Sequence, residues 1–208
     1  MAAPGWPVRL HHGDVGLRPL RLRDAAAWRE VRLRNEAWLS PWEGGPPGRR
    51  LGTWAERHSP AAFTDMLRGL RREARAGRSL PFAVLVQDRL VGQVTVAGVV
   101  RGALQGASVG YWLDGSFAGR GIMPTAVALA VDHCFGPLGL HRVEAEVRPD
   151  NAASLRVVDK LGFRREGVHR RLLHIDGAWR DHVCFGLTAE DLPDGVLRAY
   201  LASTPAGA

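Results

Sequence analysis

The alternation of apolar and polar positions divides this chain into short strands and longer helices. Runs rich in β-branched and aromatic residues predict strands, and apolar residues that recur every three or four positions predict helices. The predicted strands are 15–20, 81–86, 90–99, 108–113, 142–148, 165–175 and 178–187. The predicted helices are 25–34, 60–76, 124–135 and 151–160, with a short helix near 196–201. Because strands and helices alternate along the chain, we expect an α+β fold.

Turn residues indicate how these elements are joined. The pair 176–177 is Asp-Gly, a favoured two-residue hairpin turn, and 87–89 marks a second hairpin. Gly162 is placed to end the preceding helix in a left-handed conformation. The segment 38–52 is rich in Pro and Gly and is expected to be a loop that carries Trp38 and Trp42.

Capping residues are predicted at two helix starts. Asp24 precedes the first helical run and is expected to cap it. Thr188 and Asp191 have the spacing of a capping pair at the start of the terminal helix.

Length and composition indicate one domain. The chain has 208 residues, of which 46% are hydrophobic, enough for one well-packed core. It contains no internal repeat and no linker between two domains. We therefore expect an N-terminal tail at 1–14, one domain at 15–188, and a C-terminal helix and tail at 189–208.

Cysteine use and hydropathy favour a cytoplasmic protein. Cys134 and Cys184 are the only cysteines and lie in apolar runs, which predicts reduced core thiols and neither a disulfide framework nor a zinc cluster. The histidines form no credible cluster of metal ligands, so no metal is expected. No apolar run is long enough to cross a bilayer, and 1–12 lacks the core of a signal peptide.

The charge balance points to anionic partners. The formal net charge is +7 and the isoelectric point is about 10.8. A phosphorylated cofactor, a nucleic acid and a ribonucleoprotein surface all suit this charge. No array of stacking aromatic residues accompanies the arginines, so charge alone does not distinguish these partners.

The stretch 109–135 joins an apolar strand to a helix through a turn that contains glycine. Gly119 and Gly121 lack a Cβ, so the backbone can adopt positive φ and approach a ligand closely. Arg120 adds a charge that suits phosphate oxygens, and Pro124 suits the first turn of a helix. Backbone N–H groups left unpaired at the positive end of the helix dipole predict a cradle for a phosphate or pyrophosphate. Taken alone, the two glycines would favour an ordinary turn between a strand and a helix.

Several short motifs occur together with this turn. They are Gly110-Tyr111-Trp112-Leu113, Gly119-Arg120-Gly121-Ile122-Met123, Leu140-His141-Arg142-Val143-Glu144-Ala145, Asn151-Ala152-Ala153-Ser154, Leu161-Gly162-Phe163 and Ile175-Asp176-Gly177-Ala178-Trp179-Arg180-Asp181-His182. In this order and spacing, over 17–188, the sequence resembles the GNAT-fold N-acetyltransferases and, among them, the ribosomal-protein-alanine N-acetyltransferase (RimJ-like) branch. The resemblance implies a mixed, mostly antiparallel central sheet with splayed middle strands, flanked by about four helices.

The resemblance also implies acetyl-CoA as the acyl donor, bound between the splayed strands. Its pyrophosphate would lie on the cradle, and its pantetheine amides would pair with free strand backbone like an added strand. The cofactor-binding residues implied are Tyr111, Trp112, Leu113, Gly119, Arg120, Gly121, Ile122, Met123, Asn151 and Ser154. Asn151 is also expected to cap the helix that follows it. Ala118 stands where the family usually has Gln or Arg, which removes one side-chain contact near the cofactor.

Direct attack of an amine on the thioester requires an oxyanion donor and a proton donor for the leaving thiolate. A backbone N–H at or near Leu113 would stabilise the oxyanion. By resemblance, Ser154 is the general acid, and Tyr111 is the alternative donor.

The general base stays open. Leu173 stands where a neighbouring branch of the family has a glutamate. An α-amino group of pKa about 7.7–8.0 is roughly a quarter neutral near pH 7.4, whereas a lysine is neutral at about one part in a thousand. An N-terminal amine therefore needs little help, and a water could pass its proton to Glu144, Glu146 or Asp150. The missing glutamate favours Nα-acetylation over lysine acetylation.

By resemblance, the loop 38–43 and the hairpin 173–182 flank the entrance for the amine. Trp42, Glu43, His174 and Trp179 would hold a peptide N-terminus there. The same residues have structural alternatives, because tryptophans in loops often clamp a small hydrophobic core.

The sequence therefore predicts an acetyl-CoA-dependent N-acetyltransferase that acts on a protein N-terminus, of a ribosomal protein or at the ribosome, with weak RNA contact and no membrane. A monomer and a homodimer both stay open. Two alternatives are a small-molecule amine acetyltransferase on the same fold and a non-catalytic module that binds acyl-CoA or ribosomes.

Overall fold

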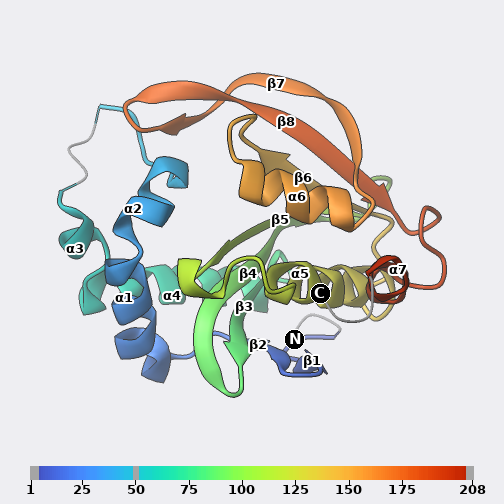
Figure 1. Cartoon of the computed structure of the whole chain (residues 1–208), viewed down its shortest axis with the longest axis horizontal. Coiled ribbons are helices and arrows are strands. Elements are labelled where there is room, and N and C mark those ends of the chain that lie inside the picture. Colours follow the sequence, from blue (N-terminus) through green and yellow to red (C-terminus); the bar gives the residue numbers. More distant parts are fainter. Residues whose placement is uncertain (1–4, 49–51, 205–208) are drawn as a thin grey trace.

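The computed structural model describes residues 5–48 and 52–204, which form one eight-stranded sheet with helices on both faces (Figure 1). The strands are β1 (Leu10–His12), β2 (Val15–Pro19), β3 (Ser79–Val86), β4 (Arg89–Val100), β5 (Gly106–Leu113), β6 (Arg142–Val147), β7 (Arg164–Ile175) and β8 (Ala178–Thr188). Their order in the sheet is β1-β2-β3-β4-β5-β6-β8-β7. Every neighbouring pair is antiparallel except β5 and β6, which are parallel. The predicted mixed, mostly antiparallel sheet is confirmed.

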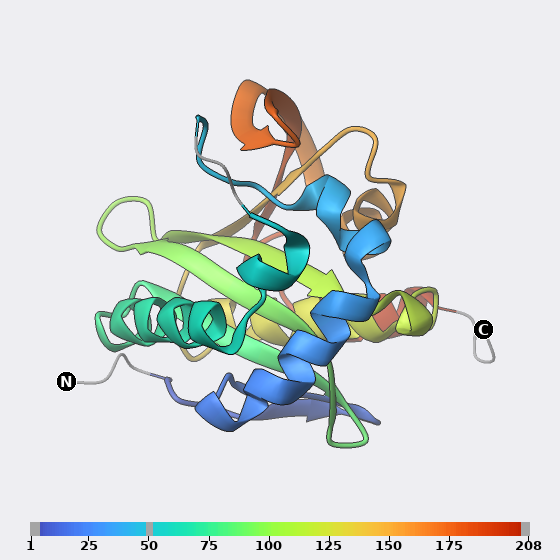
Figure 2. The same ribbon diagram turned by 90° about the vertical axis from the view of Figure 1, so that its left-hand side faces the viewer.

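The helices lie on both faces of the sheet. They are α1 (Ala25–Arg34), α2 (Glu36–Leu39), α3 (Trp54–Arg57), α4 (Pro60–Arg75), α5 (Ile122–Phe135), α6 (Ala152–Lys160) and α7 (Val196–Ser203). Figure 2 shows α1 and α4 in front of the sheet and α5 behind it. The described residues contain no helix that is both long and apolar enough to cross a membrane.

The core has two parts, one on each face of the sheet. The larger part surrounds α5, which is buried along almost its whole length because its residues are apolar on every side. The smaller part lies under α1 and α4, whose apolar stripes include Trp28, Val31, Phe63 and Leu67. These two layers hold the central strands rigidly between them.

The sheet opens between β5 and β6. The two strands pair only from Gly106 to Ser108 and from Arg142 to Glu144. Beyond Ser108 they diverge, so the following backbone of β5 has no strand partner on that side. The predicted splaying of the middle strands is confirmed, and it leaves backbone N–H and C=O groups free for a ligand.

The described structure differs from the sequence-based prediction near both ends of the chain. Residues 10–12, predicted as part of a tail, form β1, which pairs with β2. At the other end, Thr188 and Asp191 bond to each other within a turn, and α7 begins only at Val196. The predicted capping pair is therefore wrong, because the carboxylate of Asp132 on α5 accepts from the first N–H groups of α7.

Two local predictions also differ from the structure. Asp24 precedes α1, but its carboxylate accepts from the backbone N–H of Arg21 and pairs with Arg18 at 2.7 Å, so it does not cap α1. The segment predicted as a loop from residue 38 contains the end of α2 and a short 3₁₀ turn at Ser40–Trp42. The hairpin at Asp176 and Gly177 is confirmed, since both residues have positive φ.

Candidate active site

The glycine turn before α5 has the conformation of an anion cradle. Gly119 and Gly121 have φ of 78° and 72°, a region that side chains disfavour, and α5 begins directly after Gly121. A Cβ at Gly121 would lie 3.0 Å from the hydroxyl oxygen of Tyr200, whereas a Cβ at Gly119 would meet nothing within 4 Å. The first N–H groups of α5 have no partner within the helix and carry the positive end of its dipole.

The turn is anchored to α1 through Asp114. This carboxylate pairs with Arg34 at 2.5 Å and with the side-chain amide of Asn35 at 3.0 Å, and it accepts from the N–H of Ser116. Burial alone would raise the pKa of Asp114, but these hydrogen bonds outweigh burial and lower it. The carboxylate therefore stays charged and fixes the approach to the cradle.

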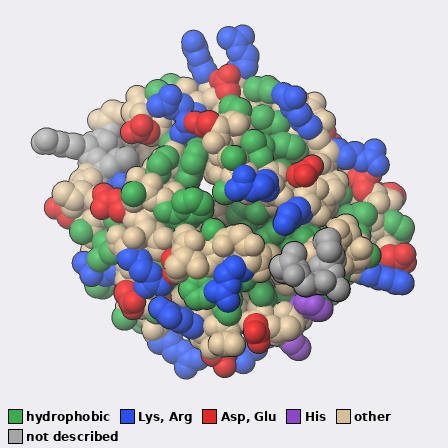
Figure 3. All heavy atoms as spheres, in the orientation of Figure 1, with side chains coloured by type: hydrophobic (Ala, Val, Ile, Leu, Met, Phe, Trp, Pro, Cys, Tyr) green, Lys and Arg blue, Asp and Glu red, His purple; other side chains and the backbone are tan. Residues whose placement is uncertain are grey.

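A cavity of about 450 Å³ lies over the cradle, between α2 and α6. It is lined by residues 118–124 except Arg120, by the end of β5, by the first turns of α6 and by the segment 38–44. In the view of Figure 3 the surface is hollowed near its centre, between α2 and α6. Arg120 lies outside this lining, with its guanidinium 5.1 Å from the ring centroid of Phe117.

The α6 wall supplies two cations that sequence reasoning missed. Arg156 and Lys160 both line the large cavity, one turn apart on α6. Residues four apart lie on the same face of a helix. The spacing of Arg156 and Lys160 would therefore indicate a phosphate-binding face if this helix were expected to face a phosphate.

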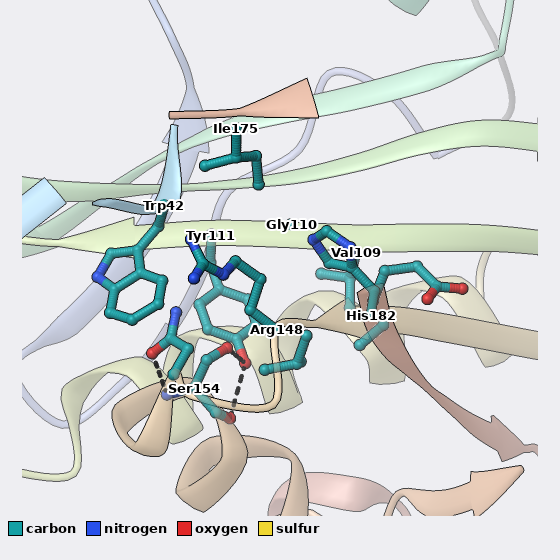
Figure 4. Close-up of a pocket in the computed structure, with 12 residues that line it drawn as sticks. Trp42, Val109, Gly110, Tyr111, Arg148, Ser154, Ile175 and His182 are labelled. Carbon is teal, nitrogen blue, oxygen red and sulfur yellow. Dashed lines mark hydrogen bonds between the residues drawn. The ribbon is translucent and has the colours of Figure 1, made fainter. Parts of the chain in front are cut away.

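A smaller cavity of about 150 Å³ lies where β5 and β6 separate (Figure 4). Its lining is Trp42, Val109, Gly110, Tyr111, Ala145, Glu146, Val147, Arg148, Asn151, Ser154, Ile175 and His182. Trp42, Tyr111, Asn151 and Ser154 line both cavities, so the two cavities meet at these side chains. Of the predicted site residues, these four lie at the junction.

Tyr111 and Ser154 form one hydrogen-bonded unit at that junction. The Ser154 hydroxyl donates to the Tyr111 oxygen at 2.8 Å, and the Tyr111 hydroxyl also reaches the Ser154 carbonyl at 3.3 Å. Asn151 accepts from the N–H of Ser154 and so caps α6, as predicted. Burial raises the pKa of Tyr111 to about 12, more than the Ser154 hydrogen bond lowers it, so the phenol stays protonated.

The three carboxylates left open as proton acceptors occupy different places. Glu144 pairs with Arg142 at 2.7 Å and Asp150 with Arg148 at 3.0 Å, and neither carboxylate is in the lining of the large or the small cavity. Glu146 lines the small cavity, with one oxygen 3.0 Å from Nδ1 of His169. Its other oxygen is buried and has no hydrogen-bond partner within the described ranges.

His182 is a buried residue of the small cavity that sequence reasoning missed. Its ring lies opposite Trp42 in Figure 4, and its Nδ1 is 3.1 Å from the carbonyl oxygen of Arg180. The sequence does not indicate that His182 lines a cavity, because the direction of its side chain depends on the register of β8 with β6.

The predicted acceptor residues fall into two groups. Trp42 lies in both cavities, beneath Arg148, whose guanidinium is 5.2 Å from its ring centroid. Glu43 lines the large cavity, but its carboxylate pairs with Arg32 and, at 3.1 Å, with Arg57. An ammonium group would therefore compete with two guanidinium groups for Glu43.

His174 and Trp179 line neither cavity. Their rings pack edge to face at 5.7 Å on the β7–β8 hairpin, and Trp179 is 52% exposed. His174 Nδ1 lies 3.1 Å from the carbonyl oxygen of Gly45, and Gly44 bridges to Ile175. These two residues belong to the rim, where the loop and the hairpin meet.

Aromatic contacts position Arg32 next to the loop that carries Glu43. Its guanidinium lies 4.9–5.6 Å from the ring centroids of Trp28, Trp54 and Trp112. Burial lowers the pKa of Arg32 to about 10, and Arg57 adds to this, yet the group stays charged near neutral pH. The Arg32–Glu43 pair thus ties the loop to α1.

The sequence and the fold of this chain are similar to those of known proteins. The family model described as the acetyltransferase (GNAT) domain matches residues 14–164. This chain belongs to the GNAT acetyltransferase family. The ribosomal protein uS5-alanine N-acetyltransferase of Escherichia coli is 30% identical over 191 residues, which are 90% of this chain and 94% of that enzyme. The probable N-acetyltransferase YjcK of Bacillus subtilis is 47% identical over 104 residues, but the match spans only 58% of that protein.

A solved GNAT structure agrees along nearly the whole chain. Mycobacterium smegmatis RimJ, in complex with CoA-disulfide, superposes with a TM-score of 0.92 at 44% identity and covers 97% of both chains. The GNAT fold, the RimJ-like resemblance and acetyl-CoA as the acyl donor are thereby confirmed. The chain is an acetyl-CoA-dependent N-acetyltransferase. The roles of its individual site residues stay predictions.

Proposed function

We propose that this GNAT enzyme acetylates the α-amino group of a protein that begins with a small residue, as a ribosomal-protein-alanine N-acetyltransferase does. The observation that supports this most is the meeting of the two cavities at Tyr111 and Ser154. One cavity is large and lies over the cradle, and the other is small and lies where β5 and β6 separate. A thioester entering from the first would meet an amine held in the second.

The large cavity suits the cofactor. The N–H groups at the start of α5 would hold the pyrophosphate, and Arg156 and Lys160 across the cavity would add charge toward its phosphates. The free backbone of β5 beyond Ser108 would pair with the pantetheine amides. One of these unpaired N–H groups, at or near Leu113, would stabilise the oxyanion.

The small cavity suits a short first side chain. Its volume of about 150 Å³ leaves room for the amine and for a first side chain such as that of Ala or Ser. Glu146 lines the small cavity and would take up the amine proton, directly or through a water. Glu144 and Asp150 are paired with arginines instead.

The charges at the entrance disfavour a polyamine or an aminoglycoside. Such polycations need several free carboxylates, but Glu43 is neutralised by Arg32 and Arg57, and Asp150 is neutralised by Arg148. A protein N-terminus brings only one amine and requires no such acidic wall. The cytoplasm, where ribosomal proteins are made, is the compartment that fits this acceptor.

We extend the proposal to weak RNA contact along β7. Arg165, Arg170 and Arg171 are exposed, and none of them pairs with a carboxylate of the described chain. Figure 3 shows basic side chains at the upper rim, over β7 and β8. Replacing the three arginines with Gln should reduce the salt dependence of ribosomal RNA binding by up to about three phosphate contacts.

A turnover panel tests the proposed acceptor. Peptides that begin with Ala, Ser and Met but are otherwise identical would be compared with free lysine and with a polyamine. We expect turnover of the Ala and Ser peptides and little of the Met peptide. Preferred acetylation of the polyamine would support the small-molecule alternative, and acetyl-CoA binding without any turnover would support the non-catalytic alternative.

A further inference from the structure

The neighbouring strands β6, β8 and β7 bring a carboxylate, a thiol and an imidazole together next to the small cavity. Glu146 on β6 stands opposite Cys184 on β8 in the sheet register. Cys184 in turn stands opposite Gly167 on β7, and His169 follows two residues later. One carboxylate oxygen of Glu146, one ring nitrogen of His169 and the sulfur of Cys184 all lie within 4.8 Å of one another.

This donor set matches the preferences of zinc. A thiolate, an imidazole and a carboxylate are the three ligand types that zinc takes, at about 2.0–2.3 Å. In a tetrahedral site these bond lengths place the ligand atoms roughly 3.4–3.7 Å apart. Because the strands fix the backbone, small rotations of the side chains are enough to reach this spacing from 4.8 Å.

Two further observations favour an ion here. The second oxygen of Glu146 is buried without a hydrogen-bond partner in the described chain, a condition that a bound cation would relieve. The His169 side chain is 52% exposed, so the cluster opens to solvent on one side. Solvent access gives an ion an entry path and gives a water the fourth coordination position.

We propose that Glu146, His169 and Cys184 form a binding site for Zn²⁺ or an ion of the same preference, and that its occupation stops acetyl transfer. On binding, the Cys184 thiol releases its proton to solvent and forms a Zn–S bond, while His169 and Glu146 contribute a nitrogen and an oxygen. No oxidation or reduction takes place. The site itself depends only on these three side chains, whereas the inhibition rests on the proposed role of Glu146 as proton acceptor.

Cobalt binding tests the site without reference to activity. Tag-free full-length protein would be titrated with Co²⁺ in the absence of cofactor, and the thiolate-to-cobalt charge-transfer absorption would be recorded. We expect one ion per chain, loss of the band in Cys184→Ser, and at least about tenfold weaker binding in His169→Ala. The matched control is His141→Ala, which removes a histidine of equal exposure that pairs with Glu190 at 3.1 Å and is not a member of the Glu146, His169 and Cys184 cluster.

Inhibition is then measured as the ratio of turnover with and without Zn²⁺. Acetylated peptide would be counted by chromatography, because free coenzyme A thiol itself binds zinc. We expect stoichiometric Zn²⁺ to lower turnover at least tenfold in the parent and in His141→Ala, reversibly with a chelator, and the ratio to approach one in Cys184→Ser. A missing charge-transfer band, or equal behaviour of Cys184→Ser and His141→Ala, would overturn the site. A band with no loss of turnover would support the site and contradict the role of Glu146.

Discussion

Replacing Tyr111 and Ser154, singly and together, tests whether they act as one donor to the leaving thiolate. The two hydroxyl oxygens are 2.8 Å apart at the junction of the cavities. The pKa of Tyr111 is about 12, whereas that of a thiol is about 8.5, so complete proton transfer from the phenol would be uphill by about 5 kcal/mol. By this proposal the pair would act as a hydrogen-bond donor to the thiolate, and solvent would supply the proton afterwards.

The magnitude follows from this role. A donor aimed at developing charge in a site shielded from water contributes about 10²–10³ in kcat. We expect Tyr111→Phe and Ser154→Ala each to lower kcat about 10²-fold while the Kd for acetyl-CoA changes by about threefold or less. Because the two hydroxyls form one unit, the double variant should also lose about 10²-fold, whereas independent roles would multiply to about 10⁴-fold.

Single-turnover release of thiol is the suitable assay, with the Kd for acetyl-CoA measured by calorimetry. Ser108→Ala is the matched control, because this exposed serine lies on β5 before the strands separate. Since the phenol stays protonated up to about pH 11, kcat should show no decline from Tyr111 below that pH. Multiplicative losses, or unchanged turnover in both single variants, would refute the reasoning.

Three other predictions concern the cradle, the C-terminal helix and the pH dependence of stability. Gly121→Ala should weaken coenzyme A binding about tenfold more than Gly119→Ala, as measured by calorimetry. Both substitutions introduce strain at positive φ, but only the Cβ at residue 121 would contact the Tyr200 hydroxyl oxygen, at 3.0 Å. Equal losses of affinity would contradict a role of this contact. Asp132→Ala removes the cap of α7 and should lower the melting temperature by about 3–6 °C, and an unchanged melting temperature would show that the cap is dispensable. Burial lowers the pKa of His58 to about 4, so the unfolded chain binds more protons than the folded one between pH 6.5 and 4. The free energy of unfolding should therefore fall by up to about 3 kcal/mol as the pH drops through that window. In denaturant titrations, the free energy of unfolding of His58→Asn should depend less on pH than that of the parent. An equal pH dependence would show that His58 can be protonated in the folded state.

The features predicted well from the sequence are those that a few adjacent residues determine. The cradle depends on the positive φ of Gly119 and Gly121 and on the helix that follows directly. The hairpin at Asp176 and Gly177 is equally local. Asn151 caps α6 through a bond to a residue three positions away. In each case the residues that determine the feature lie within a few positions of one another in the sequence.

The features that sequence reasoning missed depend on distant partners. The cap of α7 comes from Asp132, 64 residues before Val196. The three-residue strand β1 is too short to show a period, and pairing with β2 defines it. The cluster of Glu146, His169 and Cys184 depends on the register of three strands, one of which contains irregularities between Arg165 and Gly167 and between His169 and Leu173. No spacing along the chain encodes that register.

Location of the transferred acetyl group tests the central claim most directly. The enzyme would be incubated with acetyl-CoA and a peptide that begins with Ala and contains one internal lysine, and the product would be sequenced by tandem mass spectrometry. We predict a single acetyl group on the α-amino nitrogen and an unmodified lysine. Acetylation of the lysine alone, or no acetylation while acetyl-CoA is bound, would contradict the account.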